Sequence, residues 1–225
     1  MGFKLFLVRH GKTRWNLEGR YQGITNTNLT YEGIQQAKQA AIYLSKVKFS
    51  GIYSSPLGRA VETAETFKKV LKKGYVIREN LKEINFGKWE GLKFDEINEK
   101  YNYDYQNWLK DPYSNPPTDG ESFVSLTKRA LDELRRIFEE NPDNSNILVI
   151  SHGGLIVSLL VYWLKIPPEK WSSIIQSHGA INIVYIDKNF IYISQINFTG
   201  HLYRYYSDNS DSVIKKYAEI RGKDD

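Results

Sequence analysis

Two apolar stretches of the chain each end in a histidine that a glycine follows. Residues 3–10 (FKLFLVRH) end in Arg9 and His10, and residues 146–152 (NILVISH) end in His152. Short apolar runs of this kind predict buried parallel strands, and the carboxyl ends of such strands form the ligand crevice of an open α/β sheet. We therefore expect both imidazoles to lie in one cleft. One such histidine could be a satisfied structural residue, but the doubled arrangement favours a chemical role.

An arginine near the start of a predicted helix adds the features of an anion site. Residues 51–55 (GIYSS) predict a strand, and Ser55 followed by Pro56 predicts the start of a helix, which places Arg59 in its first turn. Free backbone N–H groups and the helix dipole favour an anion at this position. On its own, Arg59 could equally be a surface residue.

The elements that must position these side chains alternate along the chain. The others that the pattern predicts are a helix capped by Thr30 and ending near Lys46, a short strand at 76–78, a helix at 123–138, strands at 181–187 and 190–197 joined by a tight turn at 187–189, and a weakly helical polar tail from 201. This alternation predicts an α/β fold, a three-layer α/β/α sandwich with a mostly parallel sheet. With no repeat or linker in view, we expect residues 1–225 to form a single domain.

The segment at about 81–120 predicts a small cap inserted into that domain. It begins with an irregular stretch that contains two glycines, continues through an aromatic-rich region, and closes with the turn signals PP and DG. Its aromatic side chains suggest a pocket for an apolar or ring-bearing group, although packing is their commoner use. Trp89, Tyr103 and Trp108 are the candidates for substrate contact.

The composition excludes several classes of protein. The 225 residues contain no cysteine, so thiol catalysis, thiolate metal sites and disulfides are excluded. The net charge of +5 suits an anionic ligand, and the lysines are scattered instead of forming the basic stripe expected for nucleic-acid binding. The longest apolar stretch, 155–164, is too short to cross a bilayer, and residues 1–7 lack a signal-peptide pattern. We expect no nucleic-acid or membrane partner, a cytoplasmic location, and a monomer or homodimer.

Two competing motifs fail on spacing. The GKT at residues 11–13 would end a phosphate-binding P-loop only if glycine stood five positions before Gly11, and Phe6 occupies that place. Metal-ligand spacing such as HExxH or a histidine pair at helical offset is absent, so we expect no metal.

Four ordered motifs carry a specific resemblance. They are LFLVRHGKTRWN at 5–16, SSPLGRAVETAE at 54–65, LKEINFGKWEG at 81–91 and VISHGG at 149–154. Together they resemble the histidine phosphatase superfamily, the phosphoglycerate mutase-like proteins, over residues 3 to about 202. The resemblance implies the phosphoglycerate mutase-like fold and phosphoryl transfer without metal or cofactor.

The resemblance also implies roles for individual residues. The implied catalytic residues are His10 as the nucleophile, Glu83 as the proton donor, and His152, Arg9 and Arg59; the implied substrate-binding residues are Arg9, Asn16, Gln22, Gly23, Arg59, His152 and Gly153. From position alone, Glu79, Glu90 and Glu96 would be equally available carboxylates, so the preference for Glu83 comes from the resemblance. A cationic His152 would add a donor to the phosphate. His178 and His201 match late segments of the family pattern, and we expect them to be structural.

Three functions remain open. The run EINFGKWEG resembles the broad-specificity, α-ribazole and fructose-2,6-bisphosphate phosphatases, which implies hydrolysis of small-molecule phosphomonoesters through a phosphohistidine at His10. A cofactor-dependent phosphoglycerate mutase, which typically carries an ERHYG-like run there, is the alternative. A non-catalytic interaction module with the same fold is more remote, because the whole set of candidate residues is present.

Overall fold

The core of the protein is a six-stranded sheet with the strand order β3-β2-β4-β1-β5-β6. In this computed structural model, which describes residues 2–187 and 190–202, the strands are β1 (Gly2–Arg9), β2 (Phe49–Ser54), β3 (Val76–Ile77), β4 (Ser145–Ser151), β5 (Ile181–Asp187) and β6 (Ile191–Phe198). The strands β1 to β4 run parallel, whereas β5 is antiparallel to both β1 and β6. The predicted mostly parallel sheet is confirmed.

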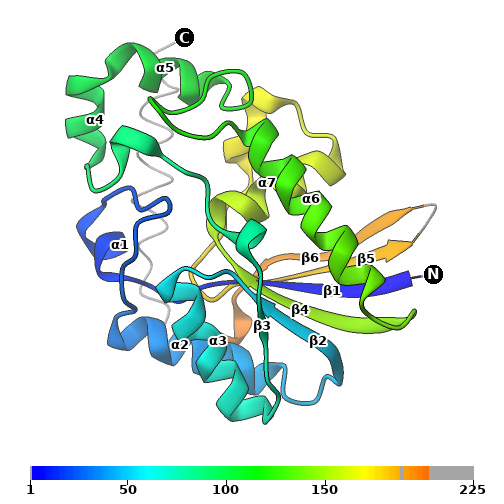
Figure 1. The fold of residues 1–225 in the computed structure, drawn as a ribbon. Coiled ribbons are helices and arrows are strands. Elements are labelled where there is room, and N and C mark those ends of the chain that lie inside the picture. The colour runs from blue at the N-terminus through cyan, green and yellow to red at the C-terminus, as the bar shows by residue number, and fades with distance from the viewer. Residues whose placement is uncertain (1, 188–189, 203–225) are drawn as a thin grey trace.

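Helices cover both faces of this sheet (Figure 1). On one face lie α2 (Tyr31–Tyr43) and α3 (Gly58–Leu71), and on the other lie α6 (Phe123–Glu139) and α7 (Gly153–Leu164). Successive strand residues point to opposite faces. Phe6 and Val8 of β1 therefore pack in the cluster under α2 and α3, while Leu5 and Leu7 pack in the cluster under α6 and α7. The predicted three layers are confirmed.

The helix boundaries follow the sequence signals with two exceptions, the first being that α2 ends at Tyr43 instead of near Lys46. Thr30 caps α2 by accepting a hydrogen bond from the Gly33 N–H, as predicted. The predicted helix start at Ser55 and Pro56 is wrong by about two residues, because α3 begins at Gly58. The Ser55 hydroxyl instead accepts from the Leu57 N–H and contacts His152. Arg59 nevertheless lies in the first turn of α3.

The segment 81–120 lies on the α6 and α7 side of the sheet (Figure 1). Together with its flanks it contains the short 3₁₀ helices η1 (Glu79–Leu81) and η2 (Gly87–Trp89) and the helices α4 (Phe94–Lys100) and α5 (Asn102–Lys110). Outside it lie α1 (Arg14–Glu18) and the 3₁₀ helices η3 (Pro168–Ser173) and η4 (Gly200–Leu202). The division into one domain with a cap insertion stays a prediction.

The cap tryptophans are packing residues. Trp89 is 0% exposed and Trp108 is 1% exposed, and both belong to the core cluster on this face. Their ring centroids lie 5.8 Å apart, and Trp108 lies 5.0 Å from Trp171. Tyr103 is 80% exposed. Substrate contact by the two tryptophans is therefore not supported, because burial of large aromatic surfaces accounts for their positions.

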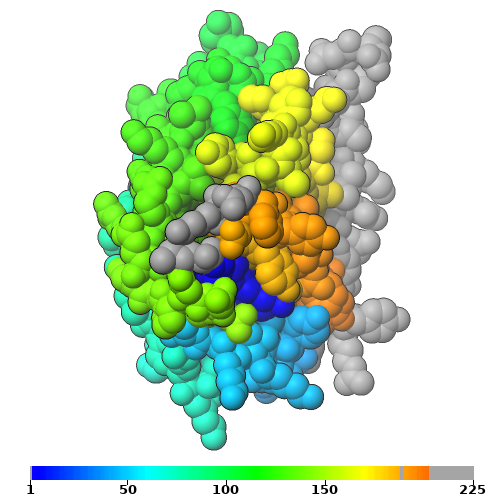
Figure 2. All heavy atoms as spheres, turned by 90° about the vertical axis from the view of Figure 1, so that its right-hand side faces the viewer, coloured from blue at the N-terminus to red at the C-terminus, as the bar shows by residue number. Residues whose placement is uncertain are grey.

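The amino end of the sheet is closed by neighbouring strands. Figure 2 shows the start of β1 in blue between the approach to β4 in yellow-green and the β5 and β6 strands in orange. The Asn144 N–H donates to the Gly2 carbonyl at 2.7 Å, and Gly2 pairs with Asp187. The candidate side chains lie at the opposite end of the sheet, where the parallel strands β1, β2 and β4 have their carboxyl ends.

Two predicted features lie wholly or partly outside the described residues: most of the turn at 187–189 and the tail beyond residue 202. Within residues 2–187 and 190–202, no helix has the length and apolar character needed to cross a membrane. The same residues hold no group of three or more potential metal ligands.

Candidate active site

The two strand-end histidines are neighbours. Arg9 of β1 pairs with Ser151 of β4, and the His10 N–H donates to the Ser151 carbonyl at 2.9 Å. The residues that follow these pairs are His10 and His152, and their ring centroids lie 5.1 Å apart. Adjacent parallel strands that end in register thus bring both imidazoles to one edge of the sheet, as their positions in the sequence predict.

Hydrogen bonds fix the tautomer of His10. Its Nδ1 lies 2.7 Å from the Gly11 carbonyl, which can only accept, so Nδ1 carries the proton. Its Nε2 accepts from the Arg59 Nε–H at 3.2 Å. Burial, followed by the charges of Arg59 and Arg9, holds the pKa of His10 well below its usual value. His10 is therefore a neutral imidazole with the Nε2 lone pair directed toward the arginine.

Arg59 is a buried cation held by the loop that precedes α2. Its side chain is 1% exposed, Nη1 donates to the Thr25 carbonyl at 2.9 Å, and Nη2 donates to the Gly23 carbonyl at 2.6 Å. Burial lowers the pKa of Arg59 to about 10, and the negative charges of Glu83 and Glu90 oppose that shift. Even so, the guanidinium stays charged near neutral pH. It lies beside His10 in a cluster that also contains Arg9, Glu83 and His152, which we call the pocket.

Arg9 provides a second guanidinium. Its Nη1 donates to the Gln176 carbonyl, while its Nε is buried without a hydrogen-bond partner. Burial lowers the pKa of Arg9 to about 10, Glu83 opposes the shift, and Arg59 adds to it. A Cβ at Gly153 would stand 3.2 Å from the Arg9 guanidinium, so Gly153 leaves room for this side chain. A buried donor without a partner is a site that a ligand oxygen could satisfy.

His152 closes the pocket from the start of α7. Its Nε2 lies 2.7 Å from the Ser55 Oγ, and its Nδ1 is buried without a partner. Burial, followed by the charges of Arg59, His10 and Arg9, lowers the pKa of His152 well below its usual value. The ring is therefore neutral in the ligand-free protein. The idea of a cationic His152 is not supported in this state.

The Glu83 carboxylate is bound to the start of α7. Its Oε2 accepts from the Gly154 N–H at 3.0 Å, and its Oε1 accepts from the Leu155 N–H at 3.1 Å and the Ile84 N–H at 3.0 Å. The first N–H groups of a helix have no partner within the helix, and a carboxylate satisfies them well. Glu83 thereby lies on the same pocket edge as His152, the N-cap residue of α7.

The other candidate carboxylates do not share this position. The side chain of Glu79 is 69% exposed and pairs with Lys82, and that of Glu96 is 43% exposed and accepts from the Lys93 N–H. Glu90 is half-buried, and its carboxylate accepts hydrogen bonds from the loop that holds Arg59. The geometry thus distinguishes Glu83 from Glu79, Glu90 and Glu96, which position in the sequence alone did not.

The loop that holds Arg59 is clamped by Glu90. The Glu90 carboxylate accepts from the Ile24 N–H at 2.8 Å, the Thr25 N–H at 2.9 Å and the Phe86 N–H at 3.1 Å. Gly23 has φ +53°, and a Cβ there would stand 1.9 Å from the Glu90 Oε1, so only glycine fits. The structure therefore places Gly23 in the pocket through its carbonyl, which binds Arg59.

Asn16 and Gln22 are committed to the structure of the neighbouring loop. The Asn16 Oδ1 accepts from the Thr13 N–H at 3.0 Å and completes the capping box of α1. The Gln22 Oε1 accepts from the hydroxyls of Thr13 and Thr27. Their oxygens organise this loop, and a contact with substrate stays a prediction for both residues.

His178 borders the pocket, which its expected structural role did not indicate. Its ring centroid lies 6.1 Å from that of His10, and its Nε2 is buried without a partner. Burial, with the charges of Arg9, His10 and Lys12, lowers the pKa of His178 well below its usual value. The available signal was topological: β5 runs antiparallel to β1 and so begins beside the end of β1, and His178 lies three residues before β5. His201, in contrast, donates to the Gly179 carbonyl and stacks on Tyr43.

The fold and this constellation define an α/β protein of a known superfamily. The model of the histidine phosphatase superfamily (branch 1) matches residues 5–199. The chain therefore belongs to the histidine phosphatase superfamily, and the predicted phosphoglycerate mutase-like fold is confirmed.

Its relatives include several named phosphatases. The chain is 30% identical to phosphoserine phosphatase 1 of Hydrogenobacter thermophilus, over 93% of this chain and 99% of the relative. It is also 30% identical to the adenosylcobalamin/alpha-ribazole phosphatase of Escherichia coli, over 86% of this chain and 95% of the relative. Among solved structures, a mutant phosphoserine phosphatase from Entamoeba histolytica in complex with phosphoserine is 33% identical, with a TM-score of 0.80, and the match covers 89% of this chain and 99% of that one.

Proposed function

We propose that this protein is a phosphatase that hydrolyses small-molecule phosphomonoesters through a phosphohistidine at His10. The observation that carries the proposal is the state of His10: a neutral ring, protonated on Nδ1, whose Nε2 accepts a hydrogen bond from Arg59 and which lies next to Arg9 in the chain. A neutral imidazole nitrogen is a competent nucleophile toward phosphorus. The His10 Nε2–P bond forms as the P–O bond of the ester breaks.

The charged and polar groups around His10 suit the transferred phosphoryl group. A phosphoryl group attached to His10 would have its equatorial oxygens close to the guanidinium groups of Arg9 and Arg59. The positive charges of these groups would stabilise the negative charge on the oxygens. The unpartnered Arg9 Nε and His152 Nδ1 offer additional polar contacts in the same pocket. The Gly11 carbonyl, which accepts from Nδ1, stabilises the positive charge of the phosphorylated ring. These residues perform the transfer by positioning and electrostatics.

Glu83 handles the proton in both half-reactions. The proposal requires that Glu83 be protonated when substrate is bound; as a carboxylic acid it then donates a proton to the leaving alkoxide oxygen while the phosphohistidine forms. The resulting carboxylate then accepts a proton from water as the water oxygen attacks phosphorus. The N–P bond breaks, inorganic phosphate leaves, and neutral His10 and protonated Glu83 are regenerated.

The first test is turnover without available metal. We expect release of p-nitrophenol from p-nitrophenyl phosphate to continue in excess chelator and to fall by at least about 10³-fold in His10→Ala, because the nucleophile is removed. His201→Ala, which lies outside the pocket, serves as the matched histidine control. Chelator-sensitive turnover, or undiminished turnover in His10→Ala, would contradict the proposal.

The named relatives direct the choice of substrate. We propose phosphate esters of small hydroxy compounds, with phosphoserine as the first candidate, because two of the relatives described above are phosphoserine phosphatases. A substrate panel should include phosphoserine, alpha-ribazole phosphate and both phosphoglycerates, the latter with and without the bisphosphate. Isomerisation of the phosphoglycerates at a rate exceeding phosphate release would favour the mutase alternative. A cytoplasmic location and a monomer or homodimer stay predictions.

A further inference from the structure

We infer that Arg129 and Glu121 form a positioning device that fixes the backbone around Glu83 and so sets the efficiency of proton transfer to the leaving group. The inference rests on the proposed role of Glu83 as the proton donor. Neither residue is within the four sequence motifs, and both follow the cap segment in the chain. Glu121 directly precedes Ser122, the N-cap of α6, and Arg129 lies in the second turn of that helix.

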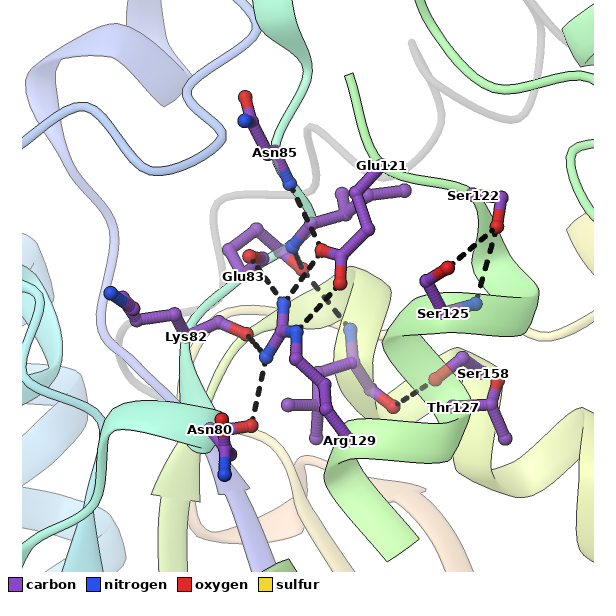
Figure 3. Close-up of polar contacts among 12 residues, drawn as sticks. Asn80, Lys82, Glu83, Asn85, Glu121, Ser122, Ser125, Thr127, Arg129 and Ser158 are labelled. Atoms are coloured by element: carbon purple, nitrogen blue, oxygen red, sulfur yellow. Dashed lines mark hydrogen bonds and ion pairs between the residues drawn. The ribbon is translucent and has the colours of Figure 1, made fainter. Parts of the chain in front are cut away.

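Arg129 binds the main chain of the segment that presents Glu83 (Figure 3). Its Nη1 donates to the Asn80 and Lys82 carbonyls, both at 2.8 Å, and its Nη2 donates to the Glu83 carbonyl at 2.9 Å. One guanidinium thus holds three carbonyls within four consecutive residues. Because a guanidinium is planar and its donors are fixed, these bonds define the direction of the segment as well as its distance.

Glu121 holds the guanidinium in place. Its Oε1 accepts from the Arg129 Nε–H at 2.7 Å and its Oε2 accepts from the Nη2–H at 2.8 Å, which is a bidentate pair. The same Oε2 accepts from the Asn85 N–H at 3.3 Å, and the Glu121 N–H donates to the Asn85 carbonyl at 2.8 Å (Figure 3). The backbone of Glu83 is therefore bound on both sides, at residues 80–83 and at residue 85.

This arrangement restricts the geometry of the segment that carries Glu83. The side chains of Arg129 and Glu121 are only 21% and 17% exposed, so their pairing is shielded from water and their geometry is restricted. The Glu83 carboxylate is held separately by N–H groups of α7. With the main chain bound by one helix and the carboxylate by another, the acid is fixed at both ends. Displacements of about 1 Å in a catalytic group can cost on the order of 10²-fold in rate.

The test compares two leaving groups. An alkyl phosphate such as phosphoserine or glycerol phosphate needs a proton on its leaving oxygen, whereas p-nitrophenolate leaves largely without one. We expect Arg129→Gln to lower kcat for the alkyl ester by about 10- to 100-fold and kcat for p-nitrophenyl phosphate by less than about threefold, with little change in KM. Arg129→Lys keeps the charge but cannot make the bidentate bonds, so its loss should fall between wild type and Arg129→Gln.

Three further variants make the result specific. Glu83→Gln should show the same dependence on leaving group, and the double variant Arg129→Gln/Glu83→Gln should be no slower than Glu83→Gln alone, because Arg129 acts through Glu83. Arg135→Gln is the matched control: Arg135 is on the same helix, 70% exposed and paired with Asp132, and its loss should leave both rates unchanged. Glu121→Gln should show the same dependence on leaving group as Arg129→Gln, with smaller losses of kcat. If circular dichroism shows that Arg129→Gln does not fold, Glu121→Gln is measured in its place.

The outcomes separate the two proposals. If Glu83→Gln shows the dependence on leaving group but Arg129→Gln slows both esters equally, or if the losses in the double variant multiply, the positioning role is overturned and the role of Glu83 stands. If Glu83→Gln itself lowers both rates equally, the proposed proton donor is wrong and the inference falls with it.

Discussion

At the scale of single residues, the protonation state of the pocket histidines is the property on which the chemistry depends. His10 and His152 are buried and His178 is partly buried, all three beside cations, and each of these surroundings lowers the pKa of the ring. A cationic ring would have no lone pair on the attacking nitrogen. Burial next to the two arginines therefore favours the neutral form of His10, which the proposed role as nucleophile requires.

The first residue-scale prediction concerns titration of these rings. In nitrogen-detected NMR spectra of the ligand-free protein, we expect His10 and His152 to be neutral at pH 6.5, where an exposed histidine is about half protonated. His201→Ala simplifies the assignment and serves as a control spectrum. A His10 ring that titrates near pH 6.5 would contradict the description of the pocket.

The same shifts imply a pH dependence of stability. A histidine whose pKa is lowered in the folded state binds a proton more readily in the unfolded state, so the free energy of unfolding falls as the pH drops below the unfolded value of about 6.5. With lowered pKa values at His10, His152 and His178, the losses add. The protein should therefore be less stable at pH 5 than at pH 7.5.

At the scale of elements, the start of α7 binds the candidate acid. The N–H groups of Gly154 and Leu155 hold the Glu83 carboxylate, and a Cβ at Gly154 would stand 2.6 Å from the Glu83 Oε1. The glycine pair after His152 is thus explained by two different neighbours, Arg9 for Gly153 and Glu83 for Gly154.

Gly154→Ala should separate activity from stability. The added methyl group displaces the Glu83 carboxylate, so we expect kcat toward an alkyl phosphate to fall by about 10-fold or more. Alanine is favoured over glycine in a helix by up to about 1 kcal/mol, and this gain opposes the cost of weakening the bonds between the Glu83 carboxylate and α7, so the melting temperature should change little. Gly74→Ala is the matched control, because nothing lies within 4 Å of a Cβ there. Full activity of Gly154→Ala would show that the carboxylate position is not critical.

The elements also show where local sequence signals end. The Thr30 cap was predictable because a threonine side chain bonds an N–H three residues away. The start of α3 was not predictable. The Ser55 hydroxyl accepts a hydrogen bond from the Leu57 N–H and contacts His152, which lies 97 positions away in the sequence. A competition between a local cap and a distant partner is decided by the tertiary structure.

At the scale of the whole molecule, the mostly parallel sheet and the edge that carries both histidines were predictable because apolar strands and their polar ends are local patterns. Contacts made by antiparallel or distant elements were not predictable: His178 reaches the pocket because β5 runs opposite to β1, and Arg129 binds carbonyls 46 to 49 positions away. The sequence left open whether the cap aromatics pack or contact substrate, and burial of Trp89 and Trp108 in the fold favours packing for these two. The sequence pattern therefore identified the candidate site residues, whereas the residues that position them were visible only in the tertiary structure.

The central claim is that His10 becomes covalently phosphorylated during turnover, and trapping measures this directly. The protein is mixed with a radiolabelled phosphomonoester, quenched within one turnover in alkaline denaturant, digested and mapped. We predict an acid-labile, base-stable label on the peptide that contains His10, absent in His10→Ala and present in His201→Ala. Turnover that proceeds with no label on that peptide, or with the label on another residue, would contradict the account.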